Sequence, residues 1–183
     1  MIDFVKLIQT RAFARQDGAI LGSVWIVSFA FTMLAINPQY SFLGLIANIL
    51  TISTPFIVAR RLKSFRDYAL DGSISFRRGF FYCIQTFFNA TLLLTIVQYL
   101  WFRFMDMGPF MAYLQTSYKM ALQAYNMTEA NIKEVMEILT MLKPIAWASM
   151  FMITDLVIAA ILSPIIAALM ARKVTKQTII NQQ

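Results

Sequence analysis

The residue with the clearest chemical potential is Asp155, an acid near the middle of the apolar stretch 144–171. An ionisable side chain inside a membrane costs several kcal/mol and is a functional candidate by default. Asp155 is either the protonatable coupling site of a carrier or a hydrogen-bonded acid that fixes helix register. The second interpretation is favoured, because the internal repeats typical of carriers are not evident. The candidate intramembrane polar site comprises Asp155, Asn48, Thr51, Asn89 and Gln85.

The basic segment 60–78 carries a second group of candidate functional residues. Six of its residues are Lys or Arg and two are Asp. Arginine pairs in a bidentate manner with carboxylates and phosphates, so we expect contacts to anionic lipid headgroups or to an acidic surface of a partner protein. The candidate contacts are Arg60, Arg61, Arg66, Arg77 and Arg78.

Other reactive side chains are scarce. The chain has no His, and its one Cys, Cys83, lies within an apolar stretch, which excludes a Cys/His metal site and an intramolecular disulfide. No nucleophile–base pair or pair of carboxylates has a spacing that suits catalysis. We therefore predict a protein that is not an enzyme, with no catalytic residue, cofactor or metal site. The net charge of +7 is attributed to residues that flank the membrane, not to nucleic acid binding.

Four apolar stretches would position the candidate residues, namely 19–36, 40–59, 79–102 and 144–171. A helix of roughly 20 apolar residues crosses a bilayer, and each stretch reaches or approaches that length. The first three contain no charged residue, and 59% of the whole chain is hydrophobic. The sequence therefore predicts one integral membrane domain, residues 1–183, with an all-α fold: an antiparallel four-helix bundle.

The basic residues are distributed unevenly along the chain. Twelve of the sixteen Lys and Arg residues lie before residue 19, within 60–78 or after residue 171. Loops rich in Lys and Arg remain on the cytoplasmic side. Both termini and a basic loop at 60–78 are therefore predicted to be cytoplasmic, which agrees with an even number of spans. Residues 103–143 are then extracytoplasmic.

The segments between the stretches also have interpretable patterns. Asn-Pro-Gln at 37–39 allows only a tight antiparallel hairpin. Residues 103–143 predict two amphipathic helices that form an extracytoplasmic cap on the bundle. Residues 1–18 suit a short helix on the inner leaflet or a frayed terminus. Gly18 and Gly22 form a G-x-x-x-G pattern, which we expect to pack within the chain more than between copies.

Several short motifs resemble a known bacterial family. These are Phe65-Arg66-Asp67, the Asp71-Gly72 turn, the Ile74-Ser75-Phe76-Arg77 entry into a helix, and the Arg172-Lys173 ending. Together with the amphipathic insert, they resemble the four-span inner-membrane family called domain of unknown function 4199. The resemblance implies a multi-pass protein of the bacterial inner membrane. It also implies a polyprenyl-phosphate glycosyltransferase as a partner, because members are often encoded near such enzymes.

Two functional hypotheses follow. The first is a non-enzymatic accessory or scaffold subunit that anchors a membrane protein partner, such as that glycosyltransferase, and contacts anionic lipids. The alternative is a small carrier or flippase-like transporter that uses Asp155. Association with a second copy of the chain stays open under either hypothesis.

Overall fold

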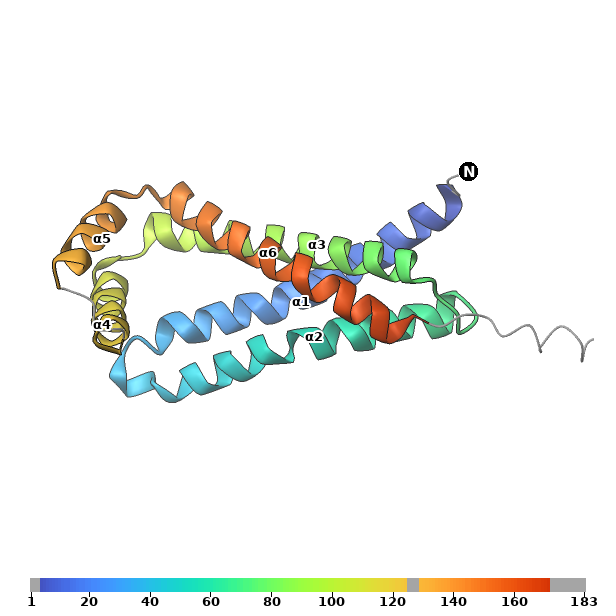
Figure 1. The fold of residues 1–183 in the computed structure, drawn as a ribbon, viewed down its shortest axis with the longest axis horizontal. Helices are drawn as coiled ribbons and strands as arrows, with labels where there is room; N and C mark the ends of the chain where they lie inside the picture. Colours follow the sequence, from blue (N-terminus) through green and yellow to red (C-terminus); the bar gives the residue numbers. More distant parts are fainter. Residues whose placement is uncertain (1–3, 125–128, 172–183) are drawn as a thin grey trace, which may run out of the picture.

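The computed structural model describes residues 4–124 and 129–171, and the regular elements of these residues are all helices (Figure 1). The elements are α1 (Phe4–Leu34), the 3-10 turn η1 (Pro38–Tyr40), α2 (Phe42–Ala69), α3 (Phe76–Phe104), α4 (Gly108–Ala124), α5 (Glu129–Met141) and α6 (Pro144–Met170). Helices α1, α2, α3 and α6 are long and apolar enough to cross a membrane. The predicted all-α bundle with four candidate spans is confirmed.

Helix α3 is the centre of the bundle. It packs along α1 on one side and along α6 on the other, whereas α2 packs mainly on α1. Its side chains Tyr82, Cys83 and Phe87 are fully buried in the main apolar core. The sequence of α3 places one group of polar residues on one side and a second group on nearly the opposite side, namely Gln85, Thr86 and Asn89, and Thr91, Thr95 and Gln98. A helix with two polar sides is not expected to face lipid broadly on either. The central position follows from that pattern.

Two glycines allow α1 to approach α3 closely. A Cβ atom added at Gly18 would lie 2.7 Å from the Cβ of Asn89 and 2.8 Å from the carbonyl oxygen of Thr86. A Cβ atom added at Gly22 would lie 3.1 Å from the Leu93 side chain. Small residues at such positions let membrane helices pack backbone to backbone. The G-x-x-x-G pattern therefore packs within the chain, as predicted.

Helix α1 is longer than the predicted first span. It is one helix of 31 residues that begins at Phe4, so the expected separate helix on the inner leaflet is wrong. Thr10, Ala14 and Asp17 on this extension are buried against the bundle. No Pro interrupts the segment, and its basic residues Arg11 and Arg15 lie on the exposed side. Long basic side chains can keep their charges in water while the opposite face packs.

The basic segment 60–78 is mostly helical, so its prediction as a loop is wrong. Helix α2 continues to Ala69 and α3 begins at Phe76. The connection turns at Asp71 and Gly72, which have positive φ angles of 50° and 76°. The predicted Asp-Gly turn is thus present. The α2 extension is helical because Leu62 and Phe65, one turn apart, bury their side chains in the core.

Helices α4 and α5 lie across the end of the bundle remote from the chain's N-terminus (Figure 1). Helix α4 is attached by Phe110, which packs against Phe102 and Trp147 at ring-centroid distances of 5.7 and 5.4 Å. Both predicted amphipathic helices are therefore present at one end. Thr128, a residue type that commonly caps helices, directly precedes Glu129 in the sequence and predicts the N-cap of α5, but it lies outside the described residues.

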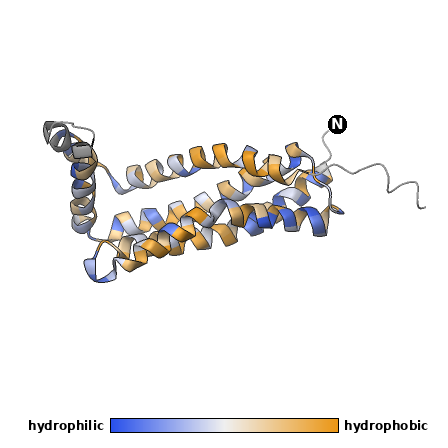
Figure 2. Cartoon of the chain, turned by 60° about the horizontal axis from the view of Figure 1, so that its bottom comes forward, coloured by the Kyte–Doolittle hydropathy of each residue, from blue (hydrophilic) through white to orange (hydrophobic). Residues whose placement is uncertain are grey.

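The start of α1, the end of α6 and the α2–α3 connection share the opposite end, which we call the basic end (Figure 1). The guanidinium of Arg66 donates to the carbonyl oxygen of Met170 at 3.2 Å and ties α2 to the end of α6. Figure 2 shows apolar residues along most of the length of the bundle helices and more hydrophilic residues toward their ends. This pattern is that of a chain that crosses a membrane four times.

Candidate functional site

The bundle contains a cavity of about 270 Å³, which we call the Asp155 crevice. All four long helices contribute to its wall. The helices form a ring in the order α2, α1, α3, α6, and the contact between α2 and α6 is the weakest of the four edges. The crevice therefore opens between α2 and α6. Its polar lining residues are Ser28, Thr32, Thr51, Thr54, Gln98 and Asp155.

Hydroxyl groups on the α1–α2 side of the crevice are committed to internal hydrogen bonds. Ser28 and Thr51 each donate to the carbonyl oxygen of Ala47 at 3.0 Å, and their hydroxyl oxygens lie 3.0 Å apart. Thr32 donates to the Ser28 carbonyl oxygen at 3.0 Å. These bonds satisfy the hydroxyl protons, and membrane helices commonly use Ser and Thr in this way.

A second polar contact closes the wall between α1 and α2. The Trp25 indole nitrogen donates to the Thr54 hydroxyl oxygen at 2.9 Å. The indole N–H is the only donor of a Trp side chain, so this bond leaves none to face the crevice. The indole N–H and the hydroxyl protons of Ser28, Thr32 and Thr51 on the α1–α2 wall are therefore all donated within the protein.

The α3–α6 side of the crevice is different, because two of its acceptor oxygens have no donor bonded to them. Asp155 Oδ2 and Gln98 Oε1 are buried and have no hydrogen-bond partner among the described residues. The Gln98 side chain is only 3% exposed, so water cannot reach it freely. A buried acceptor left unpaired costs about 1–3 kcal/mol. The expectation of a hydrogen-bonded acid is not met at Asp155 Oδ2, and the crevice is complementary to a ligand that donates hydrogen bonds.

The structure brings some of the predicted polar residues together and separates others. Thr51 and Asp155 line the same crevice. Asn48 is exposed on α2 and does not line it. Asn89 donates to the carbonyl oxygen of Gln85 on its own helix at 2.7 Å, and its Cβ faces Gly18 of α1. Asn89 therefore lies at the α1–α3 contact, where Gly18 brings the two helices together, and Gln85 lies one turn before it on α3 and does not line the crevice.

Gln98 and Ser28 belong to the crevice but were absent from the predicted site. Gln98 shares the second polar side of α3 with Thr91 and Thr95, and that side faces the bundle interior. A polar side chain buried in a membrane usually faces a helix or cavity. The polar side that contains Gln98 is visible in the sequence. The sequence does not show that this side of α3 faces α6, because that depends on how the helices pack.

An ion pair between a buried carboxylate and a partly exposed guanidinium lies near the basic end. Asp17 Oδ1 accepts from the guanidinium of Arg61 at 2.6 Å and 2.5 Å, and Asp17 Oδ2 accepts from the Tyr82 hydroxyl. Asp17 is 4% exposed and Tyr82 is fully buried. Three helices are thereby joined by one carboxylate. Sequence reasoning missed Asp17, although an acid on the same helical face as Ala14 and Gly18 was the available signal.

Two further arginines of the basic segment also make internal contacts. Arg78 donates to the Thr10 hydroxyl at 3.0 Å and to Gln9 Oε1 at 2.7 Å. Arg66 pairs with Asp67 at 2.7 Å. Of the five arginines predicted as outward contacts, Arg61, Arg66 and Arg78 thus hold the helices of the bundle together. The reason is that α1 and α2 extend beyond the predicted spans and pack against the bundle. This packing brings three kinds of acceptor close to the guanidinium groups: the Asp17 carboxylate, the Thr10 hydroxyl and the Met170 carbonyl.

The remaining basic side chains of this segment face outward. Arg60, Lys63 and Arg77 are exposed, and we call them the outer basic residues. Arg60 and Lys63 lie on α2 within one turn of each other, and Arg77 lies in the first turn of α3. They form the part of the segment that can meet an anionic surface.

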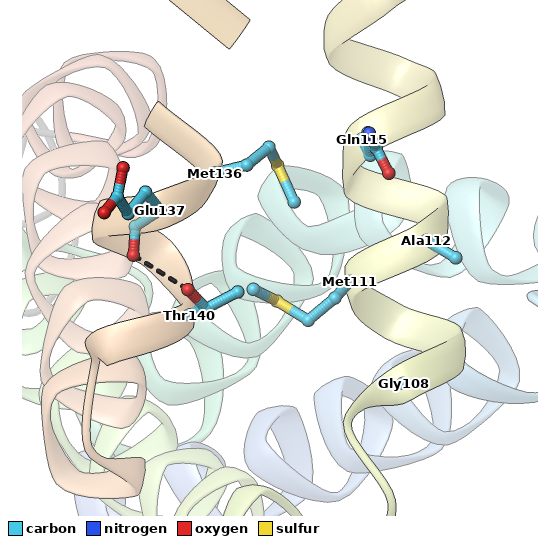
Figure 3. Close-up of a pocket in the computed structure, with 7 residues that line it drawn as sticks. All are labelled: Gly108, Met111, Ala112, Gln115, Met136, Glu137 and Thr140. Atoms are coloured by element: carbon cyan, nitrogen blue, oxygen red, sulfur yellow. Dashed lines mark hydrogen bonds between the residues drawn. The ribbon is translucent and has the colours of Figure 1, made fainter. Parts of the chain in front are cut away.

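A pocket of about 690 Å³ lies between α4 and α5 (Figure 3). Met111 and Met136 extend into the space between the two helices, and Thr140 donates to the carbonyl oxygen of Glu137 at 2.8 Å. Methionine side chains fill irregular space and adapt their shape easily. Within the part of the chain that the structure describes, no three His, Cys, Asp or Glu residues are grouped closely enough to hold a metal ion.

The fold and the crevice define a multi-pass membrane protein built as a helical bundle. A family model described as "Protein of unknown function (DUF4199)" matches residues 16–172, and the chain belongs to this family. The resemblance noted in the sequence is therefore confirmed, and the matched range includes both Asp17 and Asp155. No curated protein and no solved structure matches the chain significantly.

Proposed function

We propose that the protein is a non-enzymatic accessory subunit that holds a partner protein at the membrane. The observation that carries this proposal is the exposure of Arg60, Lys63 and Arg77 at one end, while neighbouring arginines are used for internal packing. Three exposed cations close to the apolar surface suit an acidic protein surface or anionic lipid headgroups. In this proposal the basic end and both termini face the cytoplasm of a bacterium, at its inner membrane.

The partner proposed is a polyprenyl-phosphate glycosyltransferase, on the basis of the family resemblance. Such an enzyme acts on a membrane-embedded substrate, so an intramembrane scaffold would hold it near that substrate. Anionic lipid headgroups would also bind the outer basic residues, at the edges of the contact with the partner protein. Interactions between exposed charges weaken as salt increases, because the Debye length falls to about 3 Å at 1 M ionic strength.

The experiment is co-purification from native membranes in mild detergent. The test variant replaces the outer basic residues with Gln: Arg60→Gln, Lys63→Gln and Arg77→Gln. Recovery of the partner should fall for this variant, and the loss should resemble the effect of raised salt on the unmodified protein. Cysteine-accessibility labelling must show that the topology is unchanged, because these charges also favour a cytoplasmic location.

A matched control removes three exposed cations from the opposite part of the molecule, through Arg103→Gln, Lys119→Gln and Lys143→Gln. The charge change is the same, so partner recovery should remain unchanged if the basic end is the contact. Equal recovery from both variants would refute the contact. Recovery of the unmodified chain with lipid alone, in several mild detergents, would refute the accessory function.

A second candidate function is a small carrier or flippase-like transporter. The observation that favours it is the unpartnered Asp155 carboxylate in a cavity walled by all four long helices. Transport would require Asp155 to bind and release a proton or a solute. Reconstitution into vesicles should then show solute or proton movement that is lost in Asp155→Asn, while the fold measured by circular dichroism is retained.

A further inference from the structure

We propose that the Asp155 crevice is the docking site for a transmembrane helix of the partner, and that this helix carries a lysine, an arginine or another hydrogen-bond donor at the depth of Asp155. The proposal rests on the accessory function. It adds the intramembrane part of the contact and the chemistry that recognises it. Asp155 Oδ2, Gln98 Oε1 and the opening between α2 and α6 together specify the occupant.

The chemistry of the lining determines the kind of group that fits. Asp155 and Gln98 offer buried acceptor atoms, whereas the hydroxyl protons of Ser28, Thr32 and Thr51 are already donated to main-chain carbonyls. No Lys or Arg lines the crevice. The crevice therefore lacks a cation that could pair with its carboxylate. A buried carboxylate gains most from a charged donor, because such hydrogen bonds are the strong ones.

The surroundings determine that the group arrives on a membrane-embedded helix. Toward the cap, the rings of Phe102, Trp147 and Phe151 pack together with centroid distances of 5.7 and 5.8 Å. Toward the basic end, a Cβ atom added at Gly79 of α3 would lie 3.6 Å from both Leu62 of α2 and Ala167 of α6, so the three helices converge there. The remaining side is the loose edge between α2 and α6, which faces the bilayer.

The depth of Asp155 sets the position of the donor on the partner helix. Asp155 is 11 residues after Pro144, where α6 begins, which corresponds to about 17 Å along the axis at roughly 1.5 Å per residue. That is close to the middle of a hydrocarbon core about 30 Å thick. A lipid headgroup does not reach this depth, whereas a side chain near the centre of a transmembrane helix does. The exposed apolar side chains of Ile158 on α6 and Ile52 on α2 would flank the docked helix.

The test uses the purified full-length chain and a synthetic helix in phosphatidylcholine vesicles. The host helix is a Leu-Ala peptide that spans the bilayer, with Lys, Leu or Glu at its midpoint. Association is measured by energy transfer between labels on the chain and on the peptide. The Lys peptide should associate about tenfold more tightly than the Leu peptide, as expected of a strong interhelical polar contact. The Glu peptide should associate less tightly than the Lys peptide, because its carboxyl group brings no positive charge and donates a hydrogen bond only when it is protonated.

Variants of the chain test whether tighter association of the Lys peptide than of the Leu peptide depends on the crevice. Asp155→Leu should abolish the preference for Lys, and Asp155→Asn, which keeps an acceptor oxygen but loses the charge, should reduce it. The matched control is Asn48→Leu, since Asn48 is a polar residue of the same bundle that does not line the crevice. Its preference should equal that of the unmodified chain.

Two results would overturn the proposal. The first is equal association of the Lys and Leu peptides, or a Lys preference that survives Asp155→Leu. The second is energy transfer between two differently labelled copies of the chain that depends on Asp155, which would make a second copy the occupant. In either case the accessory function is judged separately, since partner recovery by the outer basic residues is measured without reference to Asp155.

Discussion

The ion pair between Asp17 and Arg61 offers the sharpest test of what stabilises the bundle. Removing one member of a buried pair costs about 3–5 kcal/mol, because it leaves a buried charge unpaired. The two members differ in exposure: the side chain of Arg61 is 36% exposed, whereas that of Asp17 is 5% exposed. The free-energy cost of losing the partner is therefore larger for the carboxylate than for the guanidinium, which can still be solvated.

The expected order of the variants follows from this asymmetry. Arg61→Leu should lower the free energy of unfolding by about 3–5 kcal/mol, because the Asp17 carboxylate stays buried with only the Tyr82 hydroxyl. Asp17→Leu should lower it by about 1.5–3 kcal/mol, because the buried Tyr82 hydroxyl loses its charged acceptor, whereas Arg61 can turn toward water or headgroups. The double variant should cost less than Arg61→Leu alone, because the buried charge is then absent.

The assay is reversible unfolding in mixed micelles, driven by dodecyl sulfate and followed by circular dichroism and tryptophan fluorescence. Arg60→Leu is the matched control, since it removes an adjacent cation that is exposed. Its free energy of unfolding should change by no more than about 0.5 kcal/mol. A larger cost for Asp17→Leu than for Arg61→Leu, or additive costs in the double variant, would refute the reasoning.

Three other predictions address packing, topology and the crevice. Gly18→Ala should destabilise the bundle by about 1–3 kcal/mol, since the new Cβ would lie 2.7 Å from Asn89, whereas Gly44→Ala, with its nearest contact at 3.4 Å, should be tolerated in the same unfolding assay. A cysteine placed at exposed Asp71, in a Cys83→Ala background, should react with impermeant reagents only from the cytoplasmic side; reaction from the periplasmic side alone would contradict the orientation. Asp155→Leu should leave the isolated chain as stable or make it more stable by about 1–3 kcal/mol, because it removes an unpaired buried oxygen, and a clear loss of stability would show that Asp155 has a partner.

The four membrane helices could be predicted because their signal is local. Length and hydropathy of each stretch are enough to identify a span, and the Asn-Pro-Gln connection predicted the α1–α2 hairpin. Asn37 indeed accepts from the Gln39 amide at 3.0 Å in that turn. The helix ends were less accurate, because charged residues were used to set them. Helices α1 and α2 both continue through charged residues where one face remains apolar.

The residues of the candidate site were harder to predict, since their meaning depends on which helix faces which. Asp155 was identified from its depth alone. Its neighbours Gln98 and Ser28 were not, because the sequence does not show that the Thr91–Gln98 side of α3 meets α6. Asp17 was missed because it precedes the apolar stretch by two residues and was treated as part of a solvated terminus.

Asp17, which is buried, and Asp155, which is half-buried, illustrate opposite uses of a carboxylate in one bundle. Asp17 lies where three helices converge, and Arg61 and Tyr82 supply donors from two of them. Asp155 lies where α2 and α6 separate, and none of the described residues donates to its Oδ2. An Asp side chain thus links helices through hydrogen bonds where the helices are in close contact, and it keeps an unpaired acceptor oxygen where two helices separate. A fifth helix that supplied a cation would close the loose edge between α2 and α6, as Arg61 joins α2 to Asp17 of α1. The difference between the two acids is therefore the physical basis for the proposal that a partner helix lies between α2 and α6.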